Sequence, residues 1–163
     1  MIVLNNGDLH RFCQPFDADI DTIAFALSHI NRYTGHVGQY SVAQHCVLVS
    51  EQLPRELKLS GLLHDAPEAY IGDVSKPLKA LLPEYQSIEQ WYHTQIDELF
   101  DVTTEHPAIK EADLRMLITE AEAFNLPLDE FPKAEPYSID FKPWPAEVAR
   151  LRFLECFQNY FDL

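Results

Sequence analysis

Apolar residues recur every three to four positions along most of this chain, and this helical period restricts its fold more than any other feature. The segment DIDTIAFALSHINRY, for example, carries a broad apolar face between Ile20 and Ile30. Strand-like alternation of apolar and polar residues is almost absent. The pattern predicts an all-α fold, with helices over residues 19–33, 41–53, 54–65, 83–100, 106–124 and 144–161.

The length of 163 residues suits one domain with a sizeable core, and only five residues are glycine. Residues 127–143 contain four prolines and are expected to form a loop. The expected architecture is therefore a compact bundle of about six helices in a single domain that spans residues 1–163.

Acidic residues outnumber basic ones by 26 to 12, which gives a formal charge of −14. Such a surface repels nucleic-acid polymers and anionic membranes, so we expect neither as a partner. A small anion can still bind where cations gather locally. The chain has no apolar run of about 20 residues and no secretory signal pattern, and its three cysteines form no CxxC pair. These features favour a cytoplasmic protein without disulfides.

Ionisable residues interrupt the apolar faces of three predicted helices. His45 lies in the stripe of 41–53, His64 and Asp65 follow two leucines, and Asp113 lies in the stripe of 106–124. Taken singly, such a histidine is typical of a hydrogen-bonded core residue, and such an aspartate of a buried ion pair. Taken together, two histidines and two aspartates on inward faces can converge on one divalent cation. This ligand set suits manganese, cobalt, iron, nickel or zinc, with magnesium possible.

The order His45, His64-Asp65, Asp113 resembles the signature of the HD-domain metal-dependent phosphohydrolases. Three consecutive blocks look like those of the compact branch of that family: INRYTGHVGQYSVAQH, GLLHDAPEAYIGDVSKPLK and KEADLRMLITEAE. That branch includes the bacterial 5′-deoxynucleotidase and the phage deoxynucleoside triphosphate triphosphohydrolases. The resemblance covers about residues 20–125 and implies an all-α, HD-domain-like fold with one metal ion on these four ligands.

The resemblance also implies two catalytic acids. Glu68 would orient or deprotonate the attacking water or donate to the leaving oxygen, and Asp73 would assist it or bind the sugar. The alternative for each is a solvated or helix-capping carboxylate. His64 and Asp65 are expected to reach the ion from a single helix, which Pro67 should kink or end just past them because it lacks the N–H that would bond Leu63.

Substrate contacts are implied for a further set of residues. Relatives use an arginine followed by an aromatic residue for phosphate and for sugar or base, and two lysines that approach the phosphates. The corresponding residues here, together with a loop histidine that can line the pocket, are Arg32, Tyr33, His36, Lys79 and Lys110. Relatives often have tryptophan where Tyr33 stands, and Lys76 is expected to be solvated.

The expected function is hydrolysis of deoxynucleoside 5′-monophosphates, with a small nucleotide as the substrate. Deoxynucleoside triphosphate triphosphohydrolysis is the closest alternative. A non-catalytic nucleotide-binding HD module and a purely helical scaffold remain as alternatives of another class. A homo-oligomer, a dimer or larger, is expected. The aromatic stripe of the last helix, Phe153, Phe157, Tyr160 and Phe161, allows either a dimer interface or a place in the core.

Overall fold

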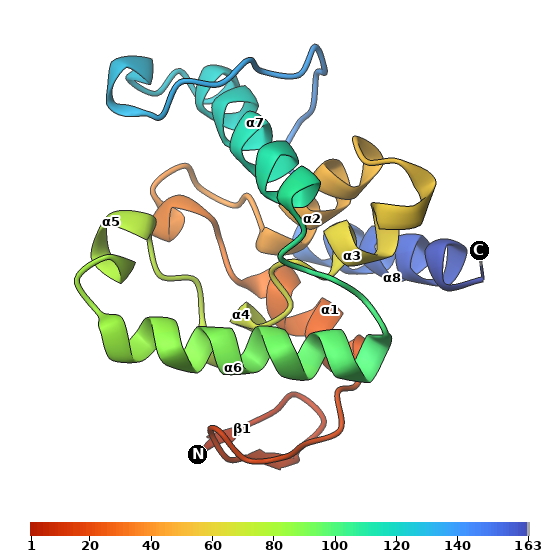
Figure 1. Ribbon diagram of the computed structural model, residues 1–163. Helices are drawn as coiled ribbons and strands as arrows, with labels where there is room; N and C mark the ends of the chain where they lie inside the picture. The colour runs from red at the N-terminus through yellow and green to blue at the C-terminus, as the bar shows by residue number, and fades with distance from the viewer. Residues whose placement is uncertain (163) are drawn as a thin grey trace.

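Eight α-helices and one two-stranded hairpin dominate residues 1–162, the part of the chain that this computed structural model describes (Figure 1). Their bounds are β1 (Ile2–Val3), β2 (Leu9–His10), α1 (Ile20–His29), α2 (Val42–Glu51), α3 (Lys58–Leu62), α4 (Glu68–Ile71), α5 (Lys76–Lys79), α6 (Pro83–Phe100), α7 (Pro107–Ala123) and α8 (Ala146–Phe161). The all-α bundle is therefore confirmed. The count exceeds six because two four-residue helices, α4 and α5, lie where no helix was predicted.

Local signals account for the starts of the helices. Asp19 caps α1 by accepting from the Thr22 N–H, and Ser41 caps α2 by accepting from the Gln44 N–H. The helices α6 and α7 each begin at a proline, which needs no intrahelical partner for its missing N–H. The end of α1 lies four residues before the predicted one, at position 29 rather than 33. The backbone is extended at Ile30, and the next residue forms a β-bridge instead of continuing the helix.

Two apolar clusters hold the helices together. The larger joins α1, α2, α3, α4, α6 and α8, and the smaller joins α2 to α7. The helix α2 belongs to both, and every residue from Val42 to Ser50 is buried. Phe153 of α8 is fully buried in the larger cluster, whereas Phe161 at the end of α8 is 60% exposed. Phe153 is therefore a core residue rather than part of a dimer interface; the expected oligomer stays a prediction.

The helix α6 lies between the N-terminal hairpin and the rest of the bundle (Figure 1). Its Tyr92 hydroxyl lies 2.6 Å from Nε2 of His10 in the hairpin, and the Tyr92 ring stacks on Tyr70 of α4. None of the helices in residues 1–162 has both the length and the apolar character needed to cross a bilayer. The single domain over residues 1–163 stays a prediction, and its last position lies outside the described residues.

Candidate metal centre

The turn between α3 and α4 carries the first pair of site residues. The helix α3 ends at Leu62, and His64 and Asp65 lie in the turn that leads to Pro67, immediately before α4. The prediction that both side chains project from a single helix is therefore wrong. Pro67 lacks the N–H that would extend α3 and disfavours helical conformation in the residue before it, so the helix stops a turn earlier than expected.

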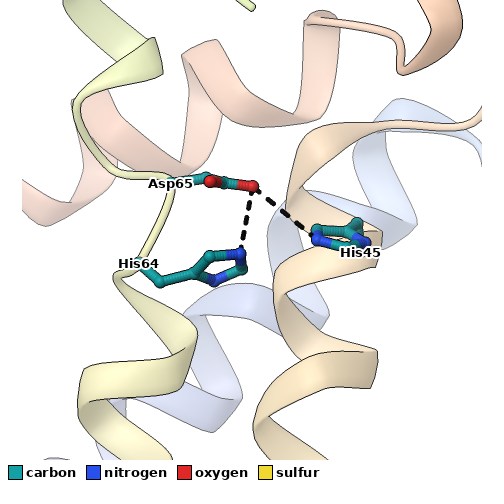
Figure 2. A group of neighbouring side chains, drawn as sticks. All are labelled: His45, His64 and Asp65. Atoms are coloured by element: carbon teal, nitrogen blue, oxygen red, sulfur yellow. Dashed lines mark ion pairs between the residues drawn. The ribbon is translucent and has the colours of Figure 1, made fainter. Parts of the chain in front are cut away.

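Four side chains from three parts of the chain meet at this turn. Figure 2 shows His64 and Asp65 reaching from the turn toward His45 on α2. The Asp65 Oδ2 lies 3.2 Å from Nε2 of His64 and 3.7 Å from Nε2 of His45. Ligand atoms of these three residues all lie within 4.8 Å of one another. Asp113 of α7 adds an oxygen 3.1 Å from His45 Nε2 and 3.9 Å from His64 Nε2.

The spacing of these atoms is what a shared ion requires. Two ligand atoms at ~2.1 Å from one ion are ~3.0–3.4 Å apart at octahedral or tetrahedral angles. The separations of 3.1 and 3.2 Å fall in that range, and those of 3.7 and 3.9 Å exceed it by up to about half an ångström. Asp113 stands outside the tightest group of three, and its oxygen on α7 is the candidate for a fourth ligand.

The hydrogen bonds of the two imidazoles decide which ring nitrogen faces the site. His64 Nδ1 lies 2.7 Å from the Gly61 carbonyl oxygen, and His45 Nδ1 lies 2.5 Å from Glu120 Oε1. Burial raises the pKa of Glu120, but Arg32 and then His45 outweigh it and hold that pKa at about 2, so Glu120 is an acceptor only. Each Nδ1 therefore carries the proton and donates it.

When the ring is neutral, each Nε2 is left with a lone pair that points at the carboxylates. Burial lowers the pKa of His64, but Asp65 outweighs it and raises that pKa well above its ordinary value, so Nε2 must lose a proton before it can bind an ion. Both Nε2 atoms are buried, and neither finds a hydrogen-bond partner of good geometry within residues 1–162. A structural core histidine would have both nitrogens satisfied. An imidazole held by Nδ1 with a free inward Nε2 is the usual state of a metal ligand. The residues present thus fit a divalent ion.

The charges of the site also favour a cation. Burial raises the pKa of Asp113, but His45 and then His64 outweigh it, and the pKa lies well below its ordinary value. Burial likewise opposes ionisation of Asp65, and His64 again lowers its pKa. Two ionised carboxylates therefore face two ring nitrogens in a largely buried site, an arrangement that a positive charge stabilises.

Glu68 and Asp73 lie beside these ligands with different exposure. Glu68 opens α4, is buried, and has an Oε2 without a hydrogen-bond partner in the described part of the chain. Burial, then Asp65 and Asp73, raise its pKa well above the ordinary value. Asp73 is half-buried, and burial raises its pKa as well. It follows Gly72, whose φ of +79° only glycine adopts easily and whose carbonyl accepts from Tyr85.

The predicted substrate residues are not all gathered at the site. Arg32 donates from Nε and Nη2 to Glu120, and the Tyr33 hydroxyl donates to the same oxygen. Lys79 pairs with Glu89 of α6. His36 and Lys110 are exposed.

Sequence reasoning missed two functional candidates, Glu120 and Lys76. Lys76, expected to be solvated, is 69% exposed but has its Nζ 3.4 Å from Asp113 Oδ2. Glu120 lies seven residues after Asp113, two helical turns away and on the same face. This spacing from Asp113 on the same predicted helix was the signal in the sequence that could have indicated it.

Comparisons with known proteins give relatives but no activity. A scan against models of protein families found no match. The chain is 31% identical over 153 residues to the uncharacterized protein RCAP_rcc00048 of Rhodobacter capsulatus, covering 84% of this chain and 76% of that protein. It is 43% identical over 112 residues to the uncharacterized protein YfdR of Escherichia coli strain K12. This second match covers 68% of the chain and 63% of YfdR, less than two thirds of its length.

Proposed function

The chain belongs to the same family as the Rhodobacter capsulatus protein RCAP_rcc00048, and we propose that it is a metal-dependent phosphohydrolase of small nucleotides. The observation that carries the proposal is the pair of buried imidazoles with inward, unpaired Nε2 atoms beside ionised aspartates and an unpaired Glu68 oxygen. The resemblance to the HD-domain phosphohydrolases in the same residues supports the same reaction class. A helical scaffold would need none of these unsatisfied atoms.

In this proposal the four ligands are His45, His64, Asp65 and Asp113. A divalent ion held by them supplies a Lewis acid that polarises a phosphoryl oxygen and makes a coordinated water more acidic. Imidazole with carboxylate and no thiolate favours manganese, cobalt, iron, nickel or zinc. These two imidazoles and two aspartates would hold the ion, and Glu68 lies three residues after Asp65 at the start of α4.

Glu68 holds and moves the proton in the proposed reaction. Its buried, unpaired Oε2 can take a proton from the attacking water or give one to the leaving oxygen, and burial, then Asp65 and Asp73, raise its pKa above that of an ordinary carboxyl group. Asp73 lies on the segment that follows Glu68, with part of its side chain exposed to solvent. It is the second group for orienting the water or for binding a sugar hydroxyl.

The substrate is proposed to be a deoxynucleoside 5′-monophosphate. Cations near the centre are few and mostly occupied, because Arg32 is paired with Glu120 and Lys79 with Glu89. An added phosphate would therefore meet chiefly the exposed Lys76. Arg32 and Lys79 could offer it only the N–H donors that Glu120 and Glu89 leave free. A triphosphate carries more charge and would need more free cations than these, in a chain of net charge −14.

A nucleotide panel tests this proposal. Purified protein would be incubated with deoxy- and ribonucleoside mono- and triphosphates in the presence of Mn²⁺, Co²⁺ or Mg²⁺. We expect release of inorganic phosphate from deoxynucleoside monophosphates, abolished in Asp65→Ala. Release of tripolyphosphate would identify the triphosphohydrolase alternative. Tight nucleotide binding without any release would favour a non-catalytic module.

A further inference from the structure

Glu120 is the most densely hydrogen-bonded side chain around the metal centre. Its carboxylate is fully buried on α7. One oxygen accepts from His45 Nδ1 and from the Tyr40 hydroxyl at 2.6 Å. The other accepts two bonds from Arg32, at 3.0 and 2.8 Å, and one from Tyr33 at 3.1 Å. With donors on both oxygens, the carboxylate has one orientation available to it.

The helix α7 presents two carboxylates to opposite nitrogens of one imidazole. Asp113 and Glu120 are seven residues apart, so they lie on the same face two turns from each other. Asp113 Oδ1 approaches Nε2 of His45, and Glu120 Oε1 accepts from Nδ1. The ring is thus held between them, and its proton is placed on the side away from the ligand cluster.

The two histidines of the centre are held by different kinds of acceptor. His64 donates to the Gly61 backbone carbonyl, which no substitution removes, whereas His45 donates to a side chain. A carboxylate behind an imidazole fixes the tautomer and the ring orientation and makes the free nitrogen a better ligand. Two hydrogen bonds from Arg32 hold that carboxylate in place.

We propose that Glu120 is the positioning residue of the metal centre: it holds the proton of His45 on Nδ1 and so prepares Nε2 as a ligand before any ion binds. The proposal rests on the proposed metal centre. It makes Arg32, Tyr33 and the buried Tyr40 the support of Glu120, so that these three residues stabilise the ligand geometry from behind the site.

The first test reads the tautomer directly in the metal-free wild-type protein. Long-range ¹H–¹⁵N correlation spectra would be recorded with labelled histidine, at a pH raised until the His45 ring is neutral, and His45→Gln would identify its signals. We expect the proton on Nδ1. A proton on Nε2 would overturn the proposal. This arm needs no bound ion and no variant at position 120, so its result does not depend on the proposed reaction.

The second test compares Mn²⁺ affinity by calorimetry in Glu120→Gln and in Glu122→Gln, an exposed glutamate on the same helix. We expect about 10- to 100-fold weaker binding in Glu120→Gln and wild-type binding in the control. A purely structural Glu120 would lower the melting temperature of the metal-free protein but leave the Mn²⁺ affinity of the folded protein unchanged, which would overturn the proposal. If wild type binds Mn²⁺ but hydrolyses no nucleotide, only the proposed function fails. If Glu120→Gln does not fold, the tautomer of the wild type decides.

Discussion

Replacing Glu68 by glutamine is expected to make the metal-free protein more stable and, with metal present, far less active. The side chain is buried, and its Oε2 has no hydrogen-bond partner within residues 1–162. Asp65 and Asp73 add repulsion to the cost of burial. Glutamine keeps the shape and removes the charge. If Glu68 served to stabilise the fold, Glu68→Gln would lower the stability and leave the activity of the folded protein unchanged. Measuring both stability and activity therefore separates a catalytic role from a structural one.

The size and pH dependence of the stabilisation follow from the same contacts. Leaving a buried polar group unsatisfied costs about 1–3 kcal/mol, and more when it is charged. The pKa of Glu68 is raised on folding. Its protonated form therefore contributes fully to the free energy of unfolding below the unfolded pKa of 4.5, and this contribution is lost as the pH rises through the folded pKa. The gain from Glu68→Gln should therefore be absent at pH 4 and reach roughly 1–3 kcal/mol at pH 8. For a chain of this length that corresponds to a melting temperature about 2–12 °C higher.

Thermal melts with a chelator, at pH 4 and pH 8, would measure this gain, with the exposed Glu122→Gln as the control. Turnover of the best nucleotide with Mn²⁺ should fall by ~10²–10⁴-fold. Bound metal favours the carboxylate, so saturating Mn²⁺ should shrink the stabilisation. A variant that melts below wild type at pH 8 in chelator would refute the burial argument. Wild-type turnover would refute the catalytic role.

Three further predictions concern packing and metal. Phe153→Ala should cost about 3–5 kcal/mol in urea unfolding because Phe153 is fully buried, whereas Phe161→Ala at the exposed end of α8 should stay within about 0.5 kcal/mol; similar losses at both would contradict the assigned core. Gly61→Ala would place a Cβ against Leu53 Cδ1, so we expect overpacking to lower the free energy of unfolding by roughly 1–3 kcal/mol and the melting temperature with it. An unchanged melting temperature would show that Leu53 moves aside freely. Chelation should lower the melting temperature, and Mn²⁺ at 100 times its Kd should raise the free energy of unfolding again by about 2.7 kcal/mol. No change in melting temperature with Mn²⁺, Co²⁺ or Zn²⁺ would argue against a metal centre.

The helices with the clearest local signals could be predicted from the sequence. The helices α6 and α7 begin where Pro83 and Pro107 indicate, because a proline start and an amphipathic period are encoded within a few neighbouring residues. The errors lie where long-range contacts compete with local preference. The helix α1 ends early because Asn31 pairs with Ser41 across a bridge. The helix α3 ends before His64, so that both ligands sit on a turn.

For the candidate site, the sequence by itself determined which residues were out of place. His45 and Asp113 interrupt apolar helical faces and His64-Asp65 follow two leucines, and burying such groups is costly unless something joins them. This reasoning needs only the period of a helix, so it identified the four residues before their distances were known.

Only the tertiary structure decided how these groups are oriented and what supports them. The tautomer of His45 depends on Glu120, a residue 75 positions away, and the approach of Lys76 to Asp113 joins residues 37 positions apart. It also decided that Arg32 directs its guanidinium to Glu120, the acceptor beside His45 Nδ1, while the expected contact of Arg32 with phosphate stays a prediction. Hydrogen bonds act over about 3 Å, and no local pattern fixes which distant donor and acceptor will lie that close.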